Sequence, residues 1–137
     1  MRKIYFDTGP LIYFLDDEKP FSDKVAAFIF NHQNEDDFYM TSTITDAEYL
    51  VYPYKMQDFS KTRGYESFLS DFGFQVVEPN RVITHLAAEL RAKYQGLKGM
   101  DAIHLATAIY FKCDIFLTND SQLHQVSEAN VVLVDNL

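Results

Sequence analysis

Short apolar runs alternate with longer amphipathic stretches along most of the chain. The short runs are rich in β-branched and aromatic residues, which predicts buried strands at 3–6, 38–41, 74–77, 115–118 and 131–134. Between them, apolar residues recur every three or four positions, which predicts helices at 11–15, 22–30, 45–52, 59–72, 80–94 and 98–109. Strands that alternate with helices favour right-handed crossovers and a parallel sheet covered on both faces. We therefore expect one three-layer α/β/α domain over residues 1–137, with a central parallel sheet of five strands.

Polar and turn-forming residues set the expected ends of these elements. Residues 7–10 read as a turn directly after the first strand, and residues 31–37 read as a polar loop. Ser22 and Asn80 are expected to cap the helices that follow them. Pro53 is expected to stop or kink the helix that begins at Thr45.

The stretch 98–109 is apolar almost all round, so we expect a helix buried at the centre of the domain. Asp101 lies in its first turn. One interpretation is a helix-start acid, stabilised by the free N–H groups and the positive end of the helix dipole. The other is a metal ligand, and it depends on which other groups the chain brings to the same place.

Four acids are expected at one edge of the sheet. Asp7 and Asp120 follow the first and fourth strands, and Asp101 begins the helix before the fourth strand. Glu48 is expected in the first turn of the helix after the second strand. In an open α/β sheet, sites form beyond the carboxyl ends of the strands. Two carboxylates about 5 Å apart repel by roughly 3 kcal/mol at an effective dielectric constant of ~20, so four require protonation or a cation. Oxygen ligands of this kind suit Mg²⁺ or Mn²⁺.

Each acid also has a purely structural interpretation. Asp7 can cap the short helix after it, and Asp120 can cap a last short helix through Leu123. Thr45 and Glu48 match a capping box, in which Glu48 reaches back to the backbone N–H of Thr45.

Composition narrows the class of protein. The net charge of −8 argues against broad nonspecific binding to nucleic acid, but a nucleic-acid enzyme that neutralises its acids with metal stays possible. The four histidines are scattered and Cys113 is the single cysteine, so neither a zinc spacing nor an internal disulfide is expected. No apolar run is long enough for a membrane span and no signal peptide is evident, so we expect a cytoplasmic protein.

Four motifs together resemble the PIN-domain family, and within it the VapC-type toxin ribonucleases. They are Asp7-Thr8-Gly9, Thr45-x-x-Glu48, the stretch Met100-Asp101-Ala102-Ile103-His104-Leu105-Ala106-Thr107-Ala108, and Leu117-Thr118-Asn119-Asp120. The resemblance implies a Mg²⁺- or Mn²⁺-dependent endoribonuclease, with Asp7, Glu48, Asp101 and Asp120 as metal-binding acids and Thr8, Thr118 and Asn119 supporting them. Many members have Asn where this chain has Gly9, and some have an acid where it has Gln122. The alternative is a PIN-like binding module without turnover.

Other residues leave two interpretations open. Arg91, Lys93 and Lys98 can track RNA phosphates, or they can form a solvated helix end. His104 lies one helical turn from Asp101 and can face the acids, although a packed, hydrogen-bonded histidine is favoured. The Asp-Thr-Gly triplet is also the signature of aspartic proteases, but their β-rich fold disagrees with the long helical patterns.

Two protein partners are expected. The aromatic stretches 49–54 and 59–72 have more apolar surface than one small sheet can cover, which predicts a homodimer through these helices. The resemblance implies a small antitoxin, whose basic residue would reach the acids from a groove beside the helix at 11–15. The surplus of acidic residues, 20 against 12 Lys and Arg, suits a basic partner.

Overall fold

The computed structural model describes residues 2–33 and 36–137, and its centre is a parallel sheet. The strands are β1 (Lys3–Phe6), β2 (Phe38–Ser42), β3 (Gln75–Val77), β4 (Ile115–Thr118) and β5 (Val131–Leu133). Their order across the sheet is β3-β2-β1-β4-β5, and every pair of neighbours is parallel. The expected five-stranded parallel sheet is confirmed.

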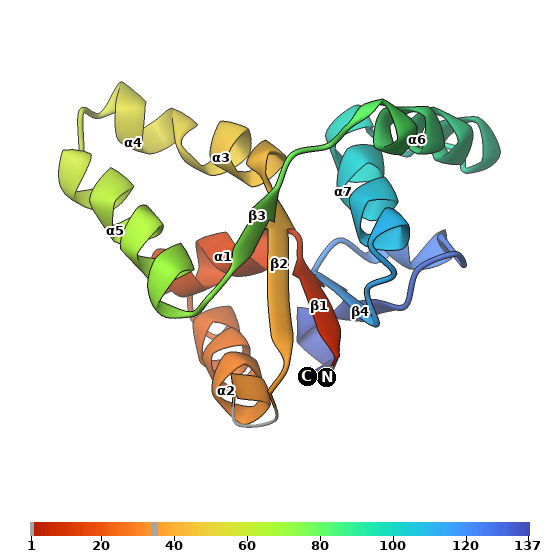
Figure 1. Ribbon diagram of the computed structural model, residues 1–137. Helices are drawn as coiled ribbons and strands as arrows, with labels where there is room; N and C mark the ends of the chain where they lie inside the picture. Colours follow the sequence, from red (N-terminus) through yellow and green to blue (C-terminus); the bar gives the residue numbers. More distant parts are fainter. Residues whose placement is uncertain (1, 34–35) are drawn as a thin grey trace.

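Helices cover both faces of this sheet (Figure 1). On one side lie α6 (Arg81–Lys93) and α7 (Gly99–Tyr110), and on the other lie α1 (Thr8–Leu15), α2 (Phe21–Gln33) and α5 (Phe59–Asp71). Alternating side chains of β1 supply both cores: Tyr5 packs with α6 and α7, whereas Ile4 and Phe6 pack with the opposite helices. The expected three-layer α/β/α arrangement is therefore confirmed. In the part of the chain that the structure describes, no helix is long and apolar enough to cross a bilayer.

The connections from β1 and into β4 place the neighbouring strands on opposite sides of β1. The carboxyl end of this strand is therefore where a ligand site is expected. From β1 the chain continues through β2 to β3, and it later returns to β4 on the other side of β1. The backbone N–H of Asp7 donates to the carbonyl of Leu117 at 2.9 Å, so the ends of β1 and β4 lie side by side. This is the topological switch point at which ligand sites form in open α/β sheets.

The first helix begins earlier than the sequence predicts. Residues 7–10 are not a free turn, because α1 begins at Thr8 with Asp7 as its N-cap, and Pro10 lies in the first turn. A proline is tolerated there, since the first N–H groups of a helix have no carbonyl partner within it. The predicted helix start at residue 11 is therefore wrong by one turn.

The helix after β2 also differs from its prediction. Its N-cap is Ser42, whose hydroxyl accepts from the backbone N–H of Ile44, so α3 (Thr43–Tyr49) begins before Thr45. The chain breaks at Leu50 and resumes as α4 (Val51–Lys55), which contains Pro53 in its first turn. In one continuous helix, the ring of Pro53 would clash with the carbonyl four residues earlier, and for this reason the break precedes the proline.

Two further helix starts can be compared with their predicted caps. Asn80 is the N-cap of α6 and accepts from the N–H of Ile83 at 3.0 Å, as predicted. In contrast, α2 begins at Phe21, so Ser22 lies inside the first turn rather than before it. This helix extends to Gln33 into the expected loop, of which residues 34–35 lie outside the described residues.

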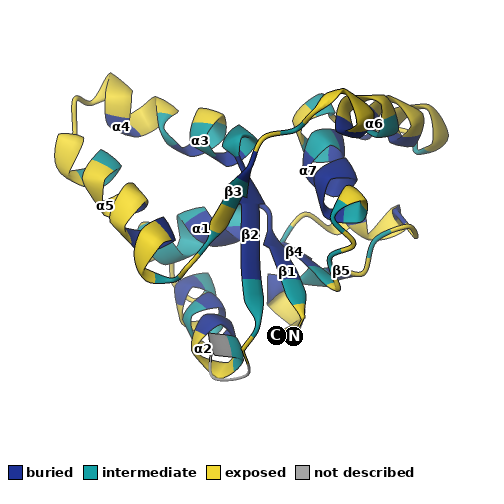
Figure 2. Cartoon of the chain, viewed as in Figure 1, coloured by how far each residue is buried: buried dark blue, intermediate teal, exposed yellow. Residues whose placement is uncertain are grey.

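The central position of α7 agrees with its sequence. Figure 2 shows this helix largely buried between α6 and the sheet, whereas α4 and the outer side of α5 are exposed. Leu105 and Ala106 are fully buried, and only the ends of the helix carry exposed apolar side chains, Met100 and Tyr110. The helix that packs on the sheet therefore also carries Asp101 to the carboxyl end of β1.

Candidate active site

Asp7 is held by groups from both sides of the switch point. Its Oδ1 accepts from the N–H of Thr8 at 2.8 Å, and its Oδ2 accepts from the hydroxyl of Thr118 at 2.8 Å. Burial raises the pKa of the Asp7 carboxyl, while His104, Thr118 and Thr8 oppose the rise. The predicted capping of α1 is confirmed, and the same contacts fix the carboxylate at the strand end.

Asp101 shows that the four acids interact. It lies in the first turn of α7, and it is partly buried. Burial, together with the negative charges of Asp7, Asp120 and Glu48, raises its pKa to about 6, and only His104 acts in the other direction. The structure therefore brings the four predicted acids within electrostatic reach of one another.

Glu48 does not form the capping box that its sequence suggests. Its Oε1 accepts from Nε2 of His104 at 2.7 Å and from the hydroxyl of Thr8 at 2.8 Å. Partial burial raises the pKa of Glu48, but the hydrogen bonds from His104 and Thr8, together with the charge interaction with His104, bring the pKa below its usual value. The capping-box interpretation is wrong because Ser42, not Thr45, caps α3. For the same reason Glu48 lies near the end of α3 and not in the first turn, where the sequence placed it.

Asp120 has both a capping contact and a place beside Asp7. It is the N-cap of the short 3-10 helix η1 (Ser121–Gln125), through the N–H of Gln122 rather than that of Leu123. The hydroxyl of Thr118 accepts from the N–H of Asp120 at 3.1 Å while it donates to Asp7. Thr118 therefore joins the two carboxylate-bearing segments.

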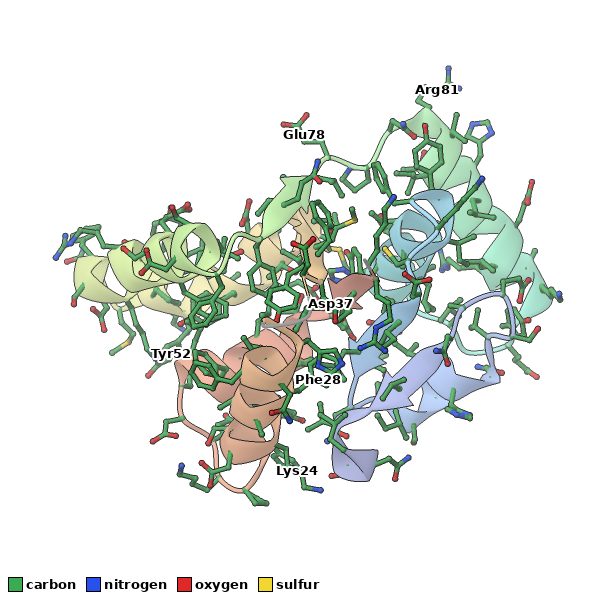
Figure 3. The ribbon with its side chains drawn as sticks, turned by 60° about the horizontal axis from the view of Figure 1, so that its bottom comes forward. Lys24, Phe28, Asp37, Tyr52, Glu78 and Arg81 are labelled. Atoms are coloured by element: carbon green, nitrogen blue, oxygen red, sulfur yellow. The ribbon has the colours of Figure 1, made fainter. Side chains whose placement is uncertain are left out.

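Asn119 does not contact the acids. Its Oδ1 accepts from the N–H of Asp135 at 3.1 Å, and its Nδ2 donates to the hydroxyl of Tyr13 at 3.4 Å. The carbonyl of Asp135 also accepts from Nζ of Lys24 on α2, which is labelled in Figure 3. Asn119 thus helps to tie the C-terminal turn η2 (Val134–Asn136) to the domain, and it supports the acids only indirectly.

His104 is both a packed, hydrogen-bonded histidine and a residue that faces the acids, so both interpretations of its sequence position apply. It is fully buried and hydrogen-bonded, with Nδ1 2.6 Å from the hydroxyl of Tyr5. Its Nε2 faces the acids, 2.7 Å from Glu48 and 3.6 Å from Asp7. The three-residue separation from Asp101, which places both side chains on one side of a helix, was the signal for this position. Sequence reasoning missed Tyr5, because nothing in a strand pattern distinguishes this tyrosine from ordinary core.

The three expected phosphate-binding residues have different environments. Lys93 forms an ion pair with Glu128 at 3.0 Å. Arg91 lies against the start of α7, where its Nε donates to the carbonyl of Leu97 at 3.4 Å. Lys98 is exposed at the N-cap position of α7. Arg91 and Lys98 therefore lie near the helix end that carries Asp101, while Lys93 is engaged elsewhere.

The donor chemistry of the acids suits a hard divalent cation. All four donors are carboxylates. Among the described residues, Asp7, Glu48 and Asp120 accept hydrogen bonds from hydroxyl, amide and imidazole groups rather than from Lys or Arg side chains. Over residues 2–33 and 36–137, no three carboxylate, imidazole or thiol groups converge tightly enough to hold an ion by themselves. Mg²⁺ keeps several waters and takes only one or two carboxylates directly, so the site fits an ion held partly through water.

Comparison with known proteins agrees with this geometry. A model of the PIN domain matches residues 4–129, and the chain belongs to the PIN domain family. None of the curated proteins that were compared matches the chain significantly in sequence.

Solved structures with the same fold include toxin–antitoxin proteins. The DNA-bound VapBC2 of Rickettsia felis superposes with a TM-score of 0.79 at 15% identity, over 96% of this chain and 98% of that chain. The DNA-bound VapBC of Salmonella typhimurium gives 0.78 at 16% identity, over 98% and 99%. VapC20 of Mycobacterium tuberculosis, a toxin that cleaves the sarcin-ricin loop, gives 0.70 at 12% identity, over 90% and 95%. At these identities the likeness shows a shared fold.

Proposed function

We propose that this protein is a divalent-metal-dependent endoribonuclease that cleaves RNA phosphodiesters by hydrolysis. The observation that carries the proposal is the gathering of Asp7, Glu48, Asp101 and Asp120 at the switch point of the sheet, where the three other acids add to burial in raising the pKa of Asp101 to about 6. Such mutual repulsion at the switch point of an α/β sheet is relieved when a cation binds. Membership of the PIN domain family supports the same class of chemistry.

Each residue has a separate task in this proposal. Asp7, Asp101 and Asp120 would hold Mg²⁺ or Mn²⁺, some of them through water, and Glu48 would be a ligand or would orient the attacking water. When bound, the ion supplies a Lewis acid that makes water a better nucleophile and stabilises charge at the phosphate. Thr118 holds the carboxylate of Asp7, and Thr8 holds that of Glu48. Arg91 and Lys98 would bind flanking phosphates.

The proposed biological setting is a toxin–antitoxin pair in the cytoplasm. Two structures with this fold are of VapBC proteins bound to DNA, and a third is of an RNA-cleaving toxin. By analogy, a small antitoxin would silence this nuclease. A homodimer is part of the proposal, since the apolar side chains of α4 and of the following turn are largely exposed.

The test is cleavage of total RNA with Mg²⁺, with Mn²⁺ and with EDTA, followed by mapping of the new ends. We expect cleavage only with metal. Asp101→Asn should reduce the rate by more than the roughly 10- to 100-fold that loss of a supporting residue costs. Asp71→Asn, which removes an exposed acid at the end of α5, is the matched control and should cleave normally. Metal binding without cleavage, or no metal binding at all, would favour a PIN-like binding module.

A further inference from the structure

A buried row of hydrogen bonds leads from the sheet to Glu48. The hydroxyl of Tyr5 on β1 lies 2.6 Å from Nδ1 of His104 on α7, and Nε2 of the same ring lies 2.7 Å from Oε1 of Glu48 on α3. Tyr5 and His104 are both fully buried, so the row is shielded from water up to the carboxylate. Three elements that are far apart in sequence therefore meet through one imidazole.

The direction of these hydrogen bonds follows from the chemistry of their ends. A carboxylate only accepts hydrogen bonds, so Nε2 of His104 donates to Oε1 of Glu48. At the other end, the hydroxyl of Tyr5 and Nδ1 of His104 form the second hydrogen bond. Both ring nitrogens are therefore engaged, and Nε2 is the one that serves the carboxylate.

Neighbouring threonines complete the same pattern. The hydroxyl of Thr41 donates to the carbonyl of Phe6 at 3.0 Å, so Thr45, 2.8 Å away, must donate to Thr41. Thr8 is then left to donate its own proton to Oε1 of Glu48, at 2.8 Å. All the hydrogen bonds that the Glu48 carboxylate accepts from described residues thus fall on Oε1, and Oε2 stays available for a ligand.

Tyr5 is well placed to fix the orientation of the imidazole. Its ring stacks on that of Phe116, with centroids 5.4 Å apart and an interplanar angle of 5°. Rotation of the His104 ring by half a turn would place carbon atoms opposite both the phenol and the carboxylate. A rigid tyrosine hydroxyl that bonds to Nδ1 therefore selects the ring orientation in which Nε2–H meets Glu48.

We propose that Tyr5 and His104 are positioning residues that hold one oxygen of Glu48 and leave the other directed to the metal and the attacking water. This role rests on the proposed nuclease function. The same logic holds at other metal sites, where hydrogen bonds behind the ligands orient them and tune their binding.

Three variants separate positioning from packing. Tyr5→Phe keeps the stacked ring and removes only the hydroxyl. His104→Gln keeps an N–H donor near the position of Nε2, whereas His104→Asn has a polar group only near the position of Nδ1. Both substitutions change the core. If His104 acts through Glu48, His104→Gln should nevertheless keep much of the Mn²⁺ affinity and cleavage rate that His104→Asn loses. Thermal melting followed by circular dichroism checks folding, and if both His104 variants unfold, Tyr5→Phe decides the question.

Two readouts do not depend on RNA cleavage. Long-range ¹⁵N–¹H NMR of the metal-free protein reports which ring nitrogen of each histidine carries a proton, and we expect a proton on Nε2 of His104. Mn²⁺ binding followed by electron paramagnetic resonance should weaken roughly 10-fold in Tyr5→Phe and in His104→Asn, and less in His104→Gln. With RNA, kcat should fall in the same order while KM stays unchanged.

The outcomes distinguish this proposal from the function on which it rests. A wild-type His104 ring without a proton on Nε2 would overturn the assignment, and so would equal losses of Mn²⁺ affinity in the Gln and Asn variants. If the wild type binds Mn²⁺ but cleaves no RNA, the nuclease proposal fails while NMR and Mn²⁺ binding still decide the positioning role. If the wild type binds no Mn²⁺, both proposals fail.

Discussion

At Asp101, burial and neighbouring charge act in the same direction on one carboxyl group. Together they raise its pKa from 3.8 to about 6. At Glu48, in contrast, two hydrogen bonds to a single carboxylate oxygen help to lower the pKa. One acid of the site therefore resists ionisation while another, close by, favours it. Perturbed carboxyl groups of this kind cluster at functional sites, and a bound cation would favour ionisation of Asp101 as well.

The raised pKa of Asp101 predicts how the metal-free protein responds to pH. The folded state binds this proton more tightly than the unfolded chain does. The stabilising contribution is therefore fully present below about pH 4 and is lost as the pH rises through about 6. Because the side chain is partly exposed to solvent, we expect a change on the order of 1 kcal/mol.

Asp101→Asn isolates this contribution, since it removes the titrating group and the repulsion. In EDTA, the melting temperature of the variant relative to wild type should rise by roughly 3–4 °C between pH 4 and pH 7.5. A difference between the two proteins that is constant over this range would contradict the assignment.

At the scale of elements, α6 holds α7 and thereby holds Asp101. Ile83, Ala87 and Leu90 are the buried positions of α6, and they belong to the same core as Leu105 and Ala106 of α7. Their three- and four-residue spacing places them on one side of the helix, against α7 and the sheet. A loss of packing in α6 should therefore disturb the site as well as the fold.

Neighbouring residues of α6 offer a matched test. Ile83→Ala removes a fully buried side chain and should lower the free energy of unfolding by about 2–5 kcal/mol. Val82→Ala changes a side chain that is 62% exposed, so it should stay within roughly 0.5 kcal/mol of wild type. Urea unfolding of both variants measures the difference, and similar losses would show that α6 does not pack as described.

At the scale of the whole molecule, exposed apolar side chains gather on α4 and on the turn to α5. Val51, Tyr52, Tyr54, Met56 and Phe59 are each more than half exposed. Tyr52 is labelled in Figure 3. A monomer rarely leaves so many neighbouring apolar groups in water, and a second copy would bury them symmetrically.

We predict that Tyr52→Glu weakens dimerisation by placing a charge in this interface. Light scattering at tens of micromolar should report a dimer for the wild type and a lower mass for the variant. Val82→Glu introduces the same charge at a position of equal exposure, 62%, on α6, and should stay dimeric. A monomeric wild type at these concentrations would refute the predicted dimer.

We also predict that metal and antitoxin compete. A basic side chain of the antitoxin would bind the four acids through charge-assisted hydrogen bonds in place of the cation. The partly buried residues Ile12 and Phe14 of α1 would line the groove beside them. Calorimetry at fixed ionic strength should show weaker binding of the antitoxin in millimolar Mg²⁺ than in EDTA, and equal affinities would place the inhibitor elsewhere.

The architecture and the location of the acids could be predicted from the amino-acid sequence. The strand and helix periods predict the parallel α/β/α fold, because each period follows from which faces an element must bury. The carboxyl ends of parallel strands share one edge, so the order of the elements was enough to bring Asp7, Glu48, Asp101 and Asp120 to one region. Capping by Asn80 and burial of α7 follow from equally local signals.

The side chains that contact those acids, in contrast, depend on how the elements pack against one another. Three features depend on how the ends of the helices meet the sheet. Ser42 caps α3 in place of Thr45, α1 begins early with Asp7 as its cap, and Asn119 bonds away from the acids. The same holds for the row from Tyr5 through His104 to Glu48, which joins residues 99 and 56 positions apart. Periodicity reports which side of its own element a residue occupies, whereas a hydrogen bond between elements requires their packed positions to within a few tenths of an ångström.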